Sequence, residues 1–209
     1  MKDAQGDSAY GRTNWRRFAV AVGVPAVVAT GIVLGVANGA LAANFAVSGQ
    51  EFKISADTLV GTGFAQYGGT DYTADGVPLP VAVSGIHEAK LYNLCQSVVV
   101  PVAPISLTIR AGRGADNPAT AEDLLIGVTR LSGDATFHNI NIGADAYTLT
   151  KGGKEAHGNK KWFGQEADDV TITGLQQTAY STSAGTFRLT GLDLKVNLPG
   201  KDGKAVECY

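Results

Sequence analysis

Alternation of apolar and polar residues with a period of two is the feature that most constrains how this chain can fold. It is clearest at Leu124, Ile126 and Val128, and it returns at Val170 and Ile172. This period predicts β-strands with one buried face, because successive side chains of a strand point to opposite faces. A content of 27 Gly and only 17% charged residues also suits a turn-rich β protein.

The alternation changes phase next to two glycines. Leu175 falls out of phase with Ile172 after Gly174, and a new apolar phase begins after Gly191. That new phase consists of Leu192, Leu194, Val196 and Leu198. A β-bulge absorbs such an extra residue and bends the strand, and Gly supplies the backbone freedom. We therefore predict bulges or corners at Gly174 and Gly191, and an all-β, curled antiparallel sheet in the form of a sandwich, barrel or prism.

Two short patterns recur along the chain. The first is Ala, an acid, a polar residue and an aliphatic, at residues 56–59, 121–124 and 167–170. The second is Ala, a polar residue, an apolar residue, Tyr or His, Asn and an aliphatic, at residues 89–94 and 135–140 and, more loosely, 185–189. Since the first precedes the second each time, they predict three weak strand–turn–strand repeats, the first enlarged by an insertion. The alternative is chance matching in a chain rich in Thr, Gly and Ala.

The N-terminus contains an apolar run, Phe18–Ala43, of 26 residues without a charged side chain. As a helix it would be roughly 39 Å long, enough to cross a bilayer. Arg12, Arg16 and Arg17 precede it and no basic residue follows until Lys53, which predicts a cytoplasmic N-terminus and an exported remainder. We therefore assign residues 1–43 to a signal peptide or N-terminal membrane anchor and 44–209 to an exported all-β domain.

The fate of this leader has two readings. The small-x-small pattern Ala40-Leu41-Ala42 predicts signal cleavage between Ala42 and Ala43. The length of the run favours an uncleaved anchor, which would hold the protein in the membrane through this helix. Arg16-Arg17-Phe18 loosely resembles a twin-arginine signal, a weaker alternative route of export.

The chain has two cysteines, Cys95 and Cys208. An even pair in an oxidising compartment predicts one disulfide, and a cysteine next to the terminal residue is an improbable core residue. The alternative is two buried free thiols. No Cys-x-x-Cys is present and the three histidines lie far apart, so we predict no metal site and no cofactor.

Motifs of catalysis are missing from the sequence. No G-x-S-x-G nucleophile motif occurs, and His87 beside Glu88 would point away from it on a strand. We predict strand-entry turns at Glu122-Asp123 and Asp168-Asp169, with a shared calcium site as the alternative. We assign no catalytic residue, and the lack of a basic excess argues against nucleic-acid binding.

Two further segments carry expectations of their own. Lys151–Lys161 contains three glycines and four lysines, so we predict a mobile surface loop. Trp162-Phe163 is expected to form a lid on the core, with an exposed contact patch as the alternative.

The whole chain resembles a family of uncharacterised exported proteins of actinobacteria. The resemblance runs from Arg16-Arg17-Phe18 through 91–95, 133–137 and 167–175 to Cys208. It implies a location in the cell envelope. Members often carry the automatic label "cholesterol esterase", but no catalytic residues accompany that label, so none are transferred to this chain.

Three functions remain open on these grounds. The first is a non-enzymatic binding or structural module of the envelope, whose apolar sheet holds a lipid or similar hydrophobic ligand. The second is a lipid or sterol ester hydrolase with a nonstandard site. The third is a self-assembling surface protein, a homo-oligomer joined through exposed strand edges.

Overall fold

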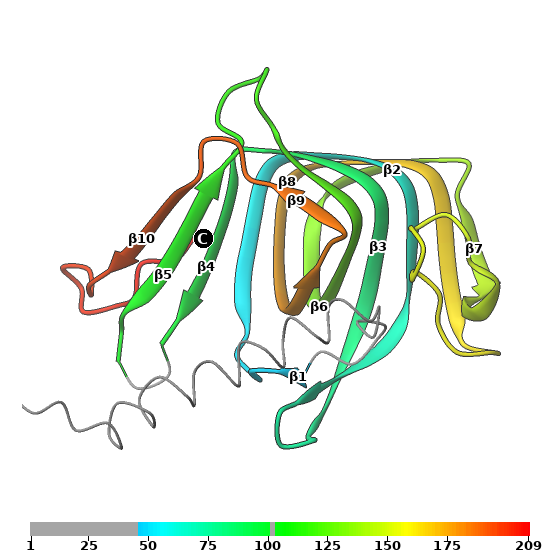
Figure 1. The fold of residues 1–209 in the computed structure, drawn as a ribbon, viewed down its shortest axis with the longest axis horizontal. Helices are drawn as coiled ribbons and strands as arrows, with labels where there is room; N and C mark the ends of the chain where they lie inside the picture. Colours follow the sequence, from blue (N-terminus) through cyan, green and yellow to red (C-terminus); the bar gives the residue numbers. More distant parts are fainter. Residues whose placement is uncertain (1–45, 101–102) are drawn as a thin grey trace, which may run out of the picture. The chain divides into compact units, whose positions relative to one another are not determined.

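The computed structural model describes residues 46–100 and 103–209 (Figure 1). The prediction of an all-β antiparallel fold is confirmed for this part of the chain. It contains ten strands and one short 3₁₀ helix. Their bounds are β1 Ala46–Val47, β2 Phe52–Thr73, β3 Pro78–Tyr92, β4 Leu94–Val99, β5 Ser106–Ala111, β6 Ala119–His138, β7 Asn141–Asp145, η1 Ala146–Thr148, β8 Phe163–Ser183, β9 Thr186–Arg188 and β10 Asp193–Asn197. The predicted leader helix and the Ala42/Ala43 cleavage site lie outside the described residues.

Four long strands close into a small barrel. Strands β2, β3, β6 and β8 pair in that order, all antiparallel. The barrel closes where Phe52–Ala56 of β2 pairs with Leu175–Ala179 of β8. A barrel is one of the curled forms that the phase changes predict.

Each of two long strands is bent by an asparagine with a positive φ. Asn93 (φ 52°) separates β3 from β4, and Asn139 (φ 51°) separates β6 from β7. Each side-chain amide donates a hydrogen bond to an aspartate on the opposite strand, Asn93 to Asp57 at 2.5 Å and Asn139 to Asp168 at 2.6 Å. Asparagine tolerates this backbone conformation better than most residues, so these pairs fix where the sheet bends.

The repeated sequence patterns coincide with these bends. Segments 56–59 and 89–94 lie opposite each other across β2, β3 and β4, and 167–170 lies opposite 135–140 across β8 and β6. In the second copy both patterns lie along the one strand β6, so a strand–turn–strand unit does not describe that copy. The recurring element is the Asp–Asn bend between paired strands.

The two glycines predicted to bend strands have that role. Gly174 (φ +61°) lies opposite a register shift between Ser132 and Asp134 in the β6–β8 pairing, so it occupies a bulge. Gly191 (φ +66°) lies in the turn between β9 and β10. Both predictions are confirmed.

Side chains fill the barrel interior. Phe64, Leu124, Val170 and Leu175 are buried in one continuous apolar cluster with their neighbours from all four long strands. The ring of Phe64 lies 5.2 Å from that of Phe137, centroid to centroid. In a barrel this small the side chains occupy the inside, so the predicted apolar interior is a packed core.

The lysine-rich loop packs against the outside of the barrel, contrary to the predicted mobile loop. Ala156 and Gly152 are buried against Ala65 of β2 and Gly85 of β3. A side chain added at Gly85 would lie 2.5 Å from the Cβ of Ala156, so only small residues permit this contact. Beneath the loop, burial and then the charge of Glu155 raise the pKa of Tyr67 to about 12.

Candidate ligand-binding face

A three-stranded extension leaves the barrel at the start of β2. Strands β4, β5 and β10 follow one another outward from β2, and Figure 1 shows them leaning away from the long strands. Residues directly opposite in paired strands share a face. The two central rows of one face are therefore Val196, Leu107, Val98 and Phe52, then Leu194, Ile109, Gln96 and Ile54. We call these two rows the open face.

The outer part of the open face is exposed. Leu194 and Val196 of β10 have exposed fractions of 56% and 64%, and Leu192 and Leu198 beside them are also exposed. Leu107 on β5 is half-buried. The sequence expectation of one buried apolar face is therefore wrong for β10, because no other element covers this side within the described residues.

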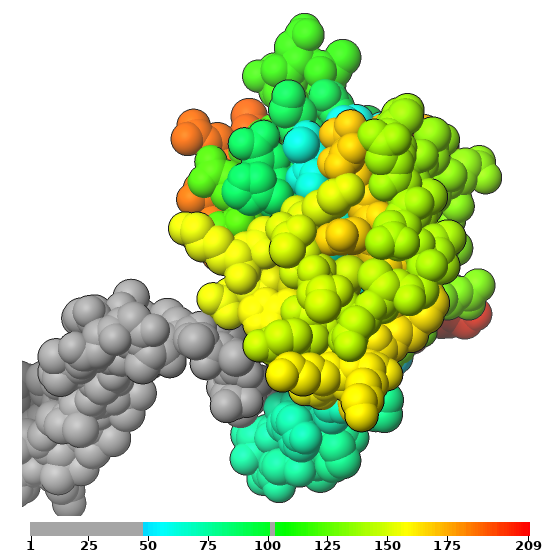
Figure 2. Space-filling model, turned by 90° about the vertical axis from the view of Figure 1, so that its right-hand side faces the viewer, coloured from blue at the N-terminus to red at the C-terminus, as the bar shows by residue number. Residues whose placement is uncertain are grey.

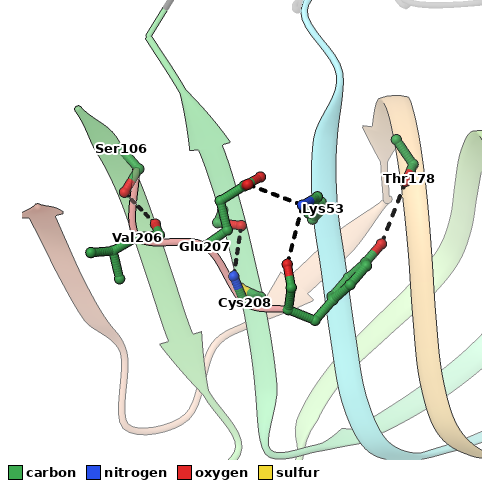
Figure 3. A network of polar contacts seen from close by, with 8 residues as sticks. Lys53, Ser106, Thr178, Val206, Glu207 and Cys208 are labelled. Carbon is green, nitrogen blue, oxygen red and sulfur yellow. Dashed lines mark hydrogen bonds and ion pairs between the residues drawn. The ribbon is translucent and has the colours of Figure 1, made fainter. Parts of the chain in front are cut away.

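The opposite face of the extension is polar and covered. Ser97, Ser106, Thr108 and Asn197 are buried there, under the C-terminal tail. Figure 3 shows how the tail is held: the backbone N–H of Cys208 donates to Ser97 Oγ at 3.1 Å, and Ser106 Oγ donates to the carbonyl of Val206. These hydrogen bonds offset the cost of burying polar groups.

Three further contacts fix the tail. The sulfur atoms of Cys95 and Cys208 lie 1.98 Å apart, at disulfide distance, as the even cysteine pair predicts. Lys53 Nζ lies 3.0 Å from Glu207 Oε2 and donates to the carbonyl of Tyr209 at 3.1 Å. The tail is thus bound to the polar face by covalent, ionic and hydrogen bonds, and among the described residues the apolar face is the uncovered side.

One buried polar group lies where the open face meets the barrel. Gln177 of β8 pairs with Ile54, and Ile54 pairs with Gln96, so all three share one face. Gln177 is buried, and its Nε2 has no hydrogen-bond partner within the described residues. A buried amide without a partner is rare and points to a group that completes it.

A second polar cluster lies beside the loop Lys151–Lys161. His87 Nδ1 is 2.9 Å from Asp123 Oδ1, and Lys151 Nζ is 2.7 Å from Asp168 Oδ1. The hydrogen bond from Lys151, then that from Asn139, lowers the pKa of Asp168. The His87–Asp123 pair escapes sequence reasoning because its partners, 36 residues apart, meet only through the β3–β6 register.

The structure brings some of the remaining predicted features together and separates others. His157 is exposed and lines the same pocket as His87, whereas the exposed His138 does not line it. Asp123 and Asp168 bind different partners. Within residues 46–100 and 103–209, no three metal-ligating side chains gather in one place. Trp162 and Phe163 are exposed, so the predicted lid is wrong and the contact-patch alternative describes them.

Comparison with known proteins gives one match. No helix among the described residues has the length and apolarity that a membrane crossing requires. No curated protein and no solved structure matches the chain. One family model covers residues 48–209, that is, the whole barrel, its extension and the tail. The chain therefore belongs to the family of unknown function DUF6230.

Proposed function

We propose that this protein is a non-enzymatic module of the cell envelope that binds the acyl chain of a lipid on its open face. The observation that carries the proposal is that the extension exposes its apolar face and buries its polar face. Leu194 and Val196 are exposed, whereas Ser97 and Ser106 are buried. Exposed apolar side chains in a continuous row are typical of an interaction surface. The leader, the disulfide and the resemblance to exported actinobacterial proteins support an envelope location.

The shape of the open face favours a chain-like ligand. Its apolar rows run from exposed β10 across β5 and β4 to Phe52 and Ile54, which join the barrel core. An acyl chain laid along such a row gains roughly 25 cal/mol for each Å² of apolar surface removed from water. A flat strip that ends at a packed core suits an extended chain better than a bulky ring system.

The inner end of the face offers a polar anchor. The Nε2 of Gln177, without a partner among the described residues, is a hydrogen-bond donor at that end; it is buried, so a ligand reaches it only when the side chains over it move apart. A carboxylate or ester carbonyl at the head of the acyl chain would supply the missing acceptor. The ligand we propose therefore has an acyl chain and an oxygen acceptor, as a fatty acid or glycerolipid does.

The test is titration of the exported protein with cis-parinaric acid, a fluorescent fatty acid. The double variant Leu194→Thr, Val196→Thr should bind at least tenfold more weakly, because it removes two apolar contacts worth about 1 kcal/mol or more each. Lys195→Thr is the matched control, since it changes the same exposed strand on the opposite face. Equal binding by the double variant and the wild type would overturn the proposal.

The alternatives remain as outcomes of further measurements. Stoichiometric labelling of one serine by a fluorophosphonate probe would favour an ester hydrolase, for which His87–Asp123 offers an oriented imidazole. The outer edge of β10 pairs with no other strand in the described part, and a free edge favours self-assembly. Light scattering would reveal that assembly.

A further inference from the structure

The end of the molecule formed by β7, η1 and the following loop carries exposed aromatic side chains. Tyr147, Trp162 and Phe163 have exposed fractions of 53%, 45% and 61%. Ile142, on β7, is exposed as well. Figure 2 faces this end, where these segments form a broad continuous surface. It lies apart from the open face of the extension, so it is a separate site.

Lysines lie close to these aromatic residues along the chain. Residues 141–163 contain four lysines and two acids, within a region, 43–209, that has 13 basic and 17 acidic residues. Of these four lysines, only Lys151 forms an ion pair in the described part of the chain, which leaves Lys154, Lys160 and Lys161 available. Lys160 Nζ lies 4.7 Å from the ring centroid of Tyr147. We call the three aromatics and these three lysines the aromatic–lysine surface.

Asp145 holds this surface in place. Its carboxylate accepts hydrogen bonds from the backbone N–H groups of Tyr147 and Lys161, both at 3.0 Å. The backbone N–H of Ala146 donates to the carbonyl of Trp162 at 2.9 Å. The two carboxylate oxygens of Asp145 thus each bind a backbone N–H group, and they hold the segments at Tyr147 and Lys161 together. A pre-ordered surface loses little conformational entropy when it binds.

We propose that the aromatic–lysine surface docks on a bilayer that contains anionic phospholipid. Tyrosine and tryptophan combine an apolar ring with a polar group and favour the boundary between water and acyl chains. Lysines extend along that boundary and attract anionic headgroups. A protein partner would need complementary pockets for the rings, whereas a bilayer accepts them at any lateral position. The local excess of lysine in an otherwise acidic domain selects anionic lipid.

The test uses the fluorescence of Trp162 in the full chain. The protein has two tryptophans, so Trp15→Phe leaves Trp162 as the only one. The chain is reconstituted in phosphatidylcholine vesicles with or without 30% phosphatidylglycerol, and doxyl-labelled lipid serves as the quencher. We expect a blue-shifted emission and quenching only with phosphatidylglycerol, both reversed by 0.5 M NaCl, because salt screens the attraction.

Charge variants sharpen the test. Lys160→Gln and Lys161→Asn should each weaken quenching-detected docking about fivefold, the effect of removing one lysine near an anionic surface. Asparagine suits position 161 because its φ is +66°. Lys195→Gln, on β10, is the control and should dock as the parent does. The proposal would be overturned by quenching in pure phosphatidylcholine, by docking of both charge variants equal to that of the parent, or by a Trp162 fully open to iodide in every vesicle.

Discussion

The barrel and its three-stranded extension are built from the same kind of strand but bury opposite faces. In the barrel, alternating residues such as Leu124 and Val170 point inward and are fully covered. In the extension, Leu194 and Val196 point to the uncovered side, and the polar side lies under the C-terminal tail. Strand pattern alone therefore does not decide burial. An apolar face becomes a core only where another element, here the far wall of the barrel, stands opposite it.

The largest expected effect comes from truncating a core residue of the barrel. Leu124→Ala should lower the free energy of unfolding by about 2–5 kcal/mol, because it leaves a cavity in a close-packed interior. Leu194→Ala on the extension should change it by no more than about 0.5 kcal/mol, because that side chain is exposed. Urea denaturation monitored by circular dichroism measures both. Similar losses for the two variants would erase the distinction between the regions.

The next effect concerns the tail that covers the polar face. Cys95 and Cys208 enclose a separation of 113 residues, so Cys95→Ser with Cys208→Ser should cost about 2–4 kcal/mol of stability. We expect the extension to lose its structure before the barrel. Amide hydrogen exchange would then show faster exchange in β5 and β10 than in β6. Uniform acceleration in both regions would mean that they unfold together.

A smaller effect is expected at the bend that connects the two regions. Asn93→Ala should cost about 1–2 kcal/mol, because alanine is strained at φ 52° and the hydrogen bond to Asp57 is lost. Asn93→Gly loses the hydrogen bond but keeps the backbone conformation, so it should cost less. Thermal unfolding compares the two. If Asn93→Gly and Asn93→Ala lower the stability equally, tolerance of the positive φ is not what Asn93 contributes.

The smallest effect is electrostatic and lies on the barrel side. The pKa of Asp168 is lowered below its ordinary value of 3.8, mainly by the hydrogen bond from Lys151. This interaction therefore stabilises the fold above pH 3.8 and is lost as the pH falls through the lower, folded-state pKa. Lys151→Met should move the pKa back toward 3.8, as NMR titration of the side-chain carboxyl would show. An unchanged pKa of Asp168 in this variant would show that the ion pair with Lys151 does not lower it.

Two bends of the sheet were predicted at glycines, whereas the two asparagine bends were not assigned from the sequence. Gly174 and Gly191 stand between two apolar phases, so a count of residues reveals the extra one. A change of apolar phase also lies across Asn139, between Phe137 and Ile140. The hydrogen bonds of Asn93 and Asn139 were not predictable, because they go to aspartates that lie opposite only after the strands pair. The His87–Asp123 pair was missed for the same reason. Local conformational preference acts within a few residues, whereas register acts between segments far apart.

The sequence by itself determined the strand class, the two glycine bends and the cysteine pair, because each depends on residue type and spacing along one chain. The tertiary structure decided which face of each strand is buried. Leu194 follows the same alternation as Leu124, yet only Leu124 has a wall of side chains opposite it. Burial depends on what lies across from a sheet face. That is set by how the barrel closes and by which face of the extension the C-terminal tail binds.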